Sequence, residues 1–214
     1  MTHTNHRQGT VTSLKGDWVV QMRAARGINN QGAYLKLKKF LELSLKYSPV
    51  NASMATVGSA LDLGWEKLID GAGNAEKATW AHIVFDDMGN MAKFLKEVVR
   101  EDMGLSVIIS GLHDETERMC RDTGIKRHTV QHSLGVWGKT DMLPHPKILE
   151  VTTMCGHGMI SFNMVRRMAQ EVRSGKISLE QAANELGRPC SCGVFNTTRT
   201  KALIQEYIAE TEKV

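Results

Sequence analysis

The chain has 214 residues, 42% of them hydrophobic, which is enough for one domain with a real core or for one domain plus a small helical appendage. Its net charge of +4 comes from Lys and Arg that are interleaved with acidic residues. A nucleic-acid-binding face normally needs a dense basic stripe, so we do not expect nucleic acid as a partner.

No run approaches the roughly 18 apolar residues of a membrane span, and the first ten residues lack the apolar core of a signal peptide. We therefore expect a cytoplasmic protein without a membrane partner. Thiols stay reduced in the cytoplasm, so its four cysteines are expected to be metal ligands, catalytic groups or core residues rather than disulfides.

The N-terminal part of the chain begins with a polar stretch over residues 1–12, for which we expect a disordered tail. The apolar run 18–22 predicts a strand, and the Gly- and Asn-rich segment 26–32 predicts a turn. Apolar residues at helical spacing from 34 to 45 predict a helix, which Pro49 stops.

The central part of the chain alternates strand and helix patterns. Compact apolar runs over 81–85 and 105–109 predict buried strands, with an amphipathic helix between them. A second helix is expected over 113–123, followed by a β-rich segment over 128–136. This succession is typical of an α/β sheet with crossover helices.

We expect residues 13–153 to form the α/β domain, with a last strand over 148–153. Residues 154–214 should form a helical segment that carries the cysteine loops, with helices at about 159–174 and 197–212. The predicted fold class is therefore α/β, a sheet with crossover helices followed by a helical C-terminal segment.

Three of the cysteines lie in two short loops rich in turn-forming residues. Cys155 belongs to Met154-Cys155-Gly156-His157-Gly158, and the other two belong to Pro189-Cys190-Ser191-Cys192-Gly193. Each loop precedes a predicted helix, whose free N–H groups and partial positive charge favour the thiolate, the form that binds metal. Gly156, Gly158 and Gly193 allow the backbone to approach a bound group closely.

The number of thiols in these loops favours an iron–sulfur centre. Cys155, Cys190 and Cys192 could hold a [4Fe-4S] cubane and leave one iron open to a substrate. Zinc is the alternative, because it prefers four protein ligands and His157 could complete a Cys₃His set. Cys120 is either a further ligand or a small buried side chain. A catalytic thiol without metal, and cysteines without any such role, also stay open.

An open iron would make this protein a lyase or oxidoreductase of anaerobic metabolism, with a small-molecule substrate. His157 is then the expected proton donor, and Arg26 and His128 are candidate substrate contacts. The alternative is a non-enzymatic accessory or maturation subunit that delivers electrons or a cluster to a partner protein, or a zinc-stabilised binding domain. The sequence leaves homo-oligomer formation open.

Overall fold

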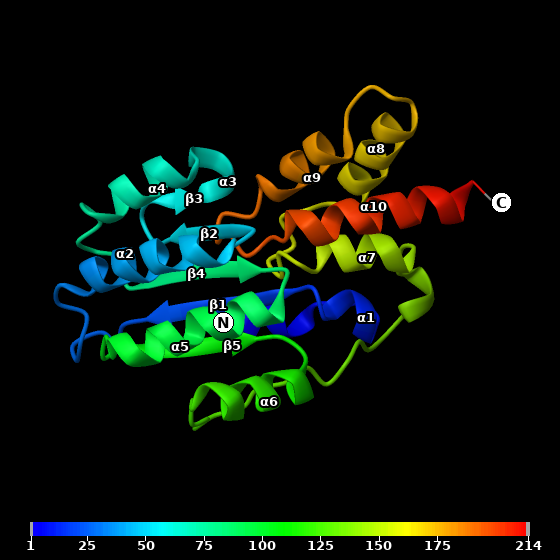
Figure 1. Cartoon of the computed structure of the whole chain (residues 1–214). Helices are drawn as coiled ribbons and strands as arrows, with labels where there is room; N and C mark the ends of the chain where they lie inside the picture. Colours follow the sequence, from blue (N-terminus) through cyan, green and yellow to red (C-terminus); the bar gives the residue numbers. More distant parts are fainter. Residues whose placement is uncertain (1, 213–214) are drawn as a thin grey trace.

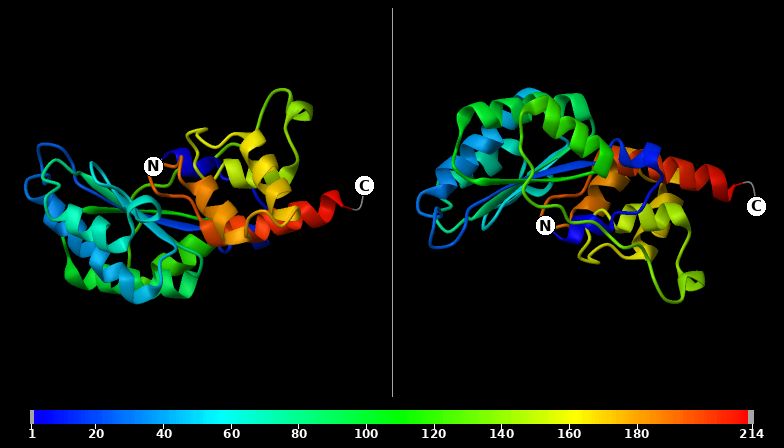
Figure 2. Two further views of the ribbon diagram at one scale, coloured as in Figure 1. Left: turned by 90° about the horizontal axis from the view of Figure 1, so that it is seen from above. Right: turned by 90° about the horizontal axis from the view of Figure 1, so that it is seen from below.

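The computed structural model describes the backbone of residues 2–212 and the side chains of residues 4–212. One five-stranded sheet lies at its centre, with helices on both faces (Figures 1 and 2). The strands are β1 Trp18–Arg23, β2 Asn51–Met54, β3 Gly58–Ser59, β4 Trp80–Phe85 and β5 Ser106–Ser110. Their order in the sheet is β3-β2-β4-β1-β5, and each neighbouring pair is antiparallel.

The described residues also form α-helices and short 3-10 helices. The α-helices are α1 Val11–Leu14, α2 Ala33–Ser44, α3 Ala60–Leu63, α4 Trp65–Ala72, α5 Met88–Glu101, α6 His113–Thr123, α7 Pro146–Thr152, α8 Phe162–Arg173, α9 Leu179–Gly187 and α10 Thr197–Thr211. The 3-10 helices are η1 Thr2–His6, η2 Leu45–Tyr47 and η3 Thr140–Met142. None of the described helices is both long enough and apolar enough to cross a membrane.

The connectivity of the sheet is a pair of split β-α-β units. β1 and β2 lie on the two sides of β4 and are joined through α2, whereas β4 and β5 lie on the two sides of β1 and are joined through α5. This is the ferredoxin-like connectivity, a name that describes topology and carries no statement about a cluster. The predicted α/β fold with crossover helices and a helical C-terminal part is confirmed.

The sheet separates two apolar cores, because successive side chains of a strand point to opposite faces. Trp18, Val20 and Met22 of β1 pack in the first core together with side chains of α2, α4 and α5. Val19 of β1 and Val84 of β4 pack in the second core with side chains of helices α7 to α10. The cysteine loops belong to this second face, which Figure 2 shows covered by the C-terminal segment.

Two predicted strands are wrong. Residues 128–136 contain neither helix nor strand, because their alternating side chains face solvent; Leu134, for example, is 78% exposed, so the segment has no buried face. The run over 148–153 belongs to α7 instead. Pro146 occupies the start of that helix, and Ile148 and Val151, three residues apart, are both buried on one helical face.

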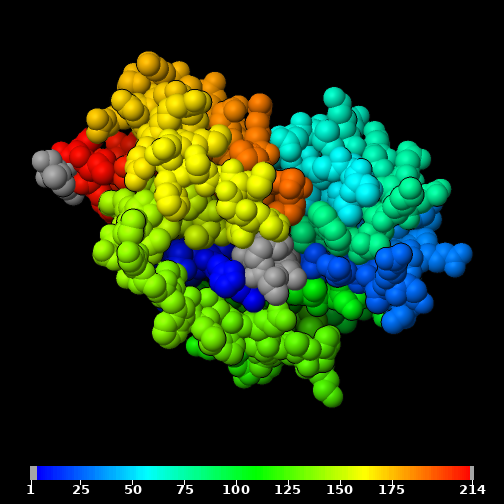
Figure 3. Space-filling view, turned by 180° about the vertical axis from the view of Figure 1, so that it is seen from behind, coloured from blue at the N-terminus to red at the C-terminus, as the bar shows by residue number. Residues whose placement is uncertain are grey.

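The N-terminal segment, where we expected a disordered tail, contains η1 and the beginning of α1 in the structure. Met1 lies outside the described residues. Figure 3 shows this dark-blue segment between the yellow C-terminal segment and the green segment that precedes it. Its contacts reach the candidate site, as described below.

Candidate metal centre

The loop that carries Cys190 and Cys192 lies on a row of polar side chains in the middle of the sheet. His82 of β4 donates from Nδ1 to the carbonyl oxygen of Cys192 at 2.9 Å, and the Ser53 hydroxyl of β2 donates to the same oxygen. Asn51 donates to the carbonyl oxygen of Phe195 at 3.2 Å. All of these side chains are buried. Two carbonyl groups of the loop are thus satisfied by the sheet on which the loop lies.

The tautomer of His82 follows from these contacts. The Gln21 amide nitrogen, which can only donate, lies 2.8 Å from Nε2, so Nε2 is the acceptor and Nδ1 is the nitrogen that donates to the Cys192 carbonyl. Trp80 packs against the imidazole, with ring centroids 4.6 Å apart. The His82 imidazole, held by these contacts, therefore supports the backbone of Cys192.

Gly193 is required for the close approach of this loop to the sheet. Its φ is +59°, and a Cβ atom there would lie 2.5 Å from Cβ of Ser53 and 3.0 Å from the carbonyl oxygen of Ala52. Gly156 and Gly158, in the other cysteine loop, also have left-handed φ angles of 71° and 69°. The glycine-rich character of both loops thus has a direct conformational cause.

The three thiols of the two loops meet in the second core. Cys190 Sγ lies 3.7 Å from Cys192 Sγ and also makes a hydrogen bond with the Cys155 side chain. Cys192 Sγ lies 3.7 Å from Nδ1 of His157. The exposed fractions of Cys155, Cys190 and Cys192 are 0%, 1% and 7%. Two loops separated by α8 and α9 therefore bring three buried sulfurs together, and the imidazole of the exposed His157 lies beside one of them.

Hydrogen bonds decide which thiol carries the negative charge. The Cys190 thiol and, more weakly, the backbone N–H groups of His157 and Met159 donate to Cys155 and lower its pKa to about 6, against the opposing effect of burial. The hydrogen bonds of Cys190 with Cys155 and Cys192, together with burial, raise the pKa of Cys190. The proton therefore stays on Cys190, and Cys155 is the thiolate.

The source of the N–H groups differs from the one we predicted. Helix α8 begins at Phe162 and α10 at Thr197, several residues after the cysteines. The side chains of Ser161 and Asn196 cap these helices at 3.1 Å and 2.9 Å. The donors to Cys155 are loop residues instead, so a glycine-rich turn takes the role that we expected of a helix N-terminus.

The donor set fits a soft metal, since three thiolates and an imidazole are ligands of zinc and of iron–sulfur clusters. With metal–sulfur bonds of about 2.3 Å, two thiolates on one tetrahedral ion lie about 3.8 Å apart, close to the 3.7 Å between Cys190 and Cys192. Thiolates that bind different irons of a cubane must lie farther apart. Across residues 4–212, no three or more His, Cys, Asp or Glu side chains are placed so that they could hold a metal ion, so metal binding would require these side chains to move.

The other two predicted site residues, Arg26 and His128, are not buried with the thiols. Arg26 is exposed in the turn beyond β1, where Asn29 and Asn30 accept backbone N–H bonds that explain their presence in the turn. His128 is exposed and contacts Thr129 at 2.8 Å.

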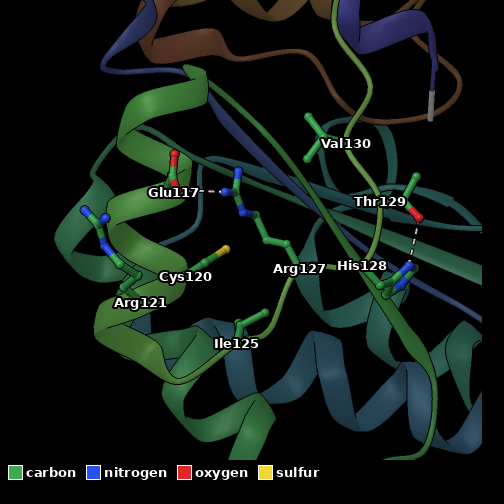
Figure 4. A pocket seen from close by; sticks show the side chains of 8 residues that line it. All are labelled: Glu117, Cys120, Arg121, Ile125, Arg127, His128, Thr129 and Val130. Atoms are coloured by element: carbon green, nitrogen blue, oxygen red, sulfur yellow. Dashed lines mark hydrogen bonds and ion pairs between the residues drawn. The ribbon is translucent and has the colours of Figure 1, made fainter.

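Cys120 of α6 belongs to the first core, on the opposite face of the sheet from the other three cysteines. It borders a separate hollow of about 390 Å³, in which Arg127 pairs with Glu117 at 2.9 Å (Figure 4). Burial raises the pKa of the Cys120 thiol. Its position agrees with the reading of Cys120 as a buried side chain rather than a ligand.

Arg7 is a residue of the site that sequence reasoning did not identify. Its buried guanidinium donates to the carbonyl oxygens of Met154, at 3.1 Å, and of Val194. Asp17, which is fully buried, accepts from Arg7 and also from Arg199, the latter at 2.8 Å. No sequence pattern indicates a role for Arg7 at the site, because it lies in a polar stretch without periodicity.

Comparisons with known protein families, with curated proteins and with solved structures found no match for this chain.

Proposed function

We propose that this chain is a metal–thiolate protein in which Cys155, Cys190 and Cys192 hold an iron–sulfur cluster. The observation that supports this proposal is the meeting of three buried thiols from two glycine-rich loops, with the pKa of Cys155 lowered by hydrogen bonds from the Cys190 thiol and from backbone N–H groups. A thiolate is the form that binds iron, and the buried position protects a cluster from solvent.

When bound, a [4Fe-4S] cluster supplies an electron carrier or, through an open iron, a Lewis acid. The chain would hold it through the three cysteines. The N–H groups of His157 and Met159 would donate to the Cys155 sulfur and so tune the reduction potential. The His157 imidazole, beside Cys192, would serve as a further ligand or as a proton donor.

We take the accessory role, rather than the enzyme, as the leading proposal. Arg26 and His128, the residues predicted to contact a substrate, are exposed, whereas the three thiols are buried. We therefore propose a cytoplasmic accessory subunit that carries electrons or a cluster to a partner protein in anaerobic metabolism. Cluster spectra that shift on addition of a small carboxylate would instead support an open-iron lyase or oxidoreductase.

Zinc is a second candidate, and one specific observation favours it. The distances from Cys192 Sγ to Cys190 Sγ and to His157 Nδ1, both 3.7 Å, suit three of the four ligands of a single tetrahedral ion. In that case Cys155, Cys190, Cys192 and His157 would form a Cys₃His site, and the protein would be a zinc-stabilised binding domain.

The test is the metal and sulfide content of protein prepared without oxygen. Stoichiometric iron and sulfide with broad absorption at about 400 nm would support the cluster, and one zinc per chain without sulfide would support the alternative. Alanine substitution of Cys155 or Cys192 should remove the metal, whereas Cys120→Ala, the matched control on the other face of the sheet, should retain it. If Cys155→Ala and Cys192→Ala both retain the metal, both assignments are refuted.

A further inference from the structure

One guanidinium joins the two cysteine loops. Arg7 donates to the carbonyl oxygen of Met154, the residue before Cys155, and to that of Val194, two residues after Cys192. Because both acceptors are backbone carbonyl oxygens, these contacts position the loops themselves. The loops carry all three thiols of the candidate centre.

The Arg7 side chain is itself held in place. It is 6% exposed and pairs with Asp17, whose side chain is fully buried. The carboxylate of Asp17 also accepts from the Asn196 side chain at 3.2 Å and from Arg199 at 2.8 Å. A planar, always charged guanidinium can donate in several fixed directions, which suits a bridge between two carbonyls and a carboxylate.

We propose that Arg7 is a positioning residue of the metal centre, because it sets the distance between the Cys155 loop and the Cys190–Cys192 loop. This inference rests on the proposed function. Arg7 follows η1, so the docking of the N-terminal segment and the binding of metal favour the same arrangement. By linkage, a bound metal should in turn hold the N-terminal segment in place.

The main test compares Arg7→Met with a control that lowers stability elsewhere. Leu37→Ala removes a fully buried side chain of the first core, on the face of the sheet away from the cysteines. In metal-loaded protein prepared without oxygen, a chelator should remove metal from Arg7→Met about 10-fold or more faster than from wild type or Leu37→Ala, the range known for residues that orient metal ligands. Equal rates in Arg7→Met and Leu37→Ala would overturn the proposal.

A second readout does not depend on a bound metal. In metal-free, reduced protein, iodoacetamide should modify Cys155 and Cys192 about 10-fold faster in Arg7→Met than in Leu37→Ala, as measured by mass spectrometry, because loss of the charged hydrogen bonds between the loops favours local opening. If wild type binds no metal, the proposed function fails, but the alkylation rates still test whether Arg7 positions the loops. Unchanged alkylation in Arg7→Met would overturn that role.

Arg7→Lys covers the case in which Arg7→Met does not fold. Lysine keeps a positive charge beside Asp17 but lacks the planar fork that reaches both carbonyls. If Arg7→Met folds, the rates of metal loss and alkylation of Arg7→Lys should lie between those of wild type and Arg7→Met. If Arg7→Met does not fold, the two rates of Arg7→Lys should be well above the wild-type rates. Wild-type rates in Arg7→Lys would contradict the bridge.

Discussion

Arg7 donates a hydrogen bond to the carbonyl oxygen of Met154 at 3.1 Å, although 147 positions separate the two residues. This contact places the N-terminal segment against the residue that precedes Cys155. Together with the bond to Val194, it makes the N-terminal segment part of the candidate metal centre. The site is therefore built from both ends of the chain and from the middle of the sheet.

The first prediction concerns two glycines with similar φ angles. Gly193→Ala should lower the free energy of unfolding by about 2–4 kcal/mol, because its Cβ atom would meet Ser53 and Ala52 in addition to adopting a left-handed backbone. Gly158→Ala should cost only about 1–2 kcal/mol, since nothing lies within 4 Å of its Cβ position. Urea unfolding of the metal-free proteins measures both, and equal costs would contradict the close approach at Gly193.

The second prediction concerns the pH dependence of the metal-free, reduced protein. The lowered pKa of Cys155 adds stability above the ordinary thiol pKa of about 8.5, and this stability is lost as the pH falls through about 6. The raised pKa of Cys190 acts in the opposite sense, since its contribution is present below about pH 8.5 and is lost as the pH rises further. The contribution of the pair should therefore be largest near pH 8.5.

Urea unfolding between about pH 6 and pH 9.5 tests this dependence. Cys155→Ala should remove the rise in unfolding free energy from pH 6 to pH 8.5. Cys120→Ala should keep the rise, because Cys120 lies in the other core and its thiol pKa is raised rather than lowered. A rise that persists in Cys155→Ala would show that another group causes it.

The third prediction concerns the buried charges beside the site. Arg199, whose side chain is 3% exposed, pairs with Asp17 at 2.8 Å and with Glu150 at 3.0 Å. Arg199→Met should lower the free energy of unfolding by about 3–5 kcal/mol, because it leaves two buried carboxylates without this partner. Lys201→Met, in the same helix, breaks a largely exposed pair with Glu180 and should cost less than about 1 kcal/mol. Similar losses in denaturant unfolding would argue against the buried network.

The fourth prediction separates the two candidate metals through His157. If the centre is a cluster on three cysteines, His157→Ala should retain iron and sulfide, whereas Cys192→Ala loses both. If the centre is Cys₃His zinc, His157→Ala should weaken zinc binding by about 10-fold or more, because one of four ligands is lost. Metal analysis and a competition titration with a chelator distinguish the two outcomes.

Local patterns predicted much of the first core. The strands at β1, β4 and β5 follow from compact apolar runs, and α5 begins where the Asp87 side chain accepts from the N–H of Asn90 at 2.6 Å. β2 and β3 escaped prediction because they are short and contain small or polar residues such as Ser53. Their place in the sheet depends on pairing with β4, a contact distant in sequence.

The sequence by itself determined the α/β fold class and the presence of three thiols in glycine-rich loops. Both could be predicted because periodicity and turn-forming residues act over a few neighbouring positions. Only the tertiary structure decided that Cys155 meets Cys190, that Cys120 lies on the other face of the sheet, and that Arg7 joins the two loops. Those relations depend on long-range packing and on buried charges that need partners, neither of which leaves a periodic signal in the chain.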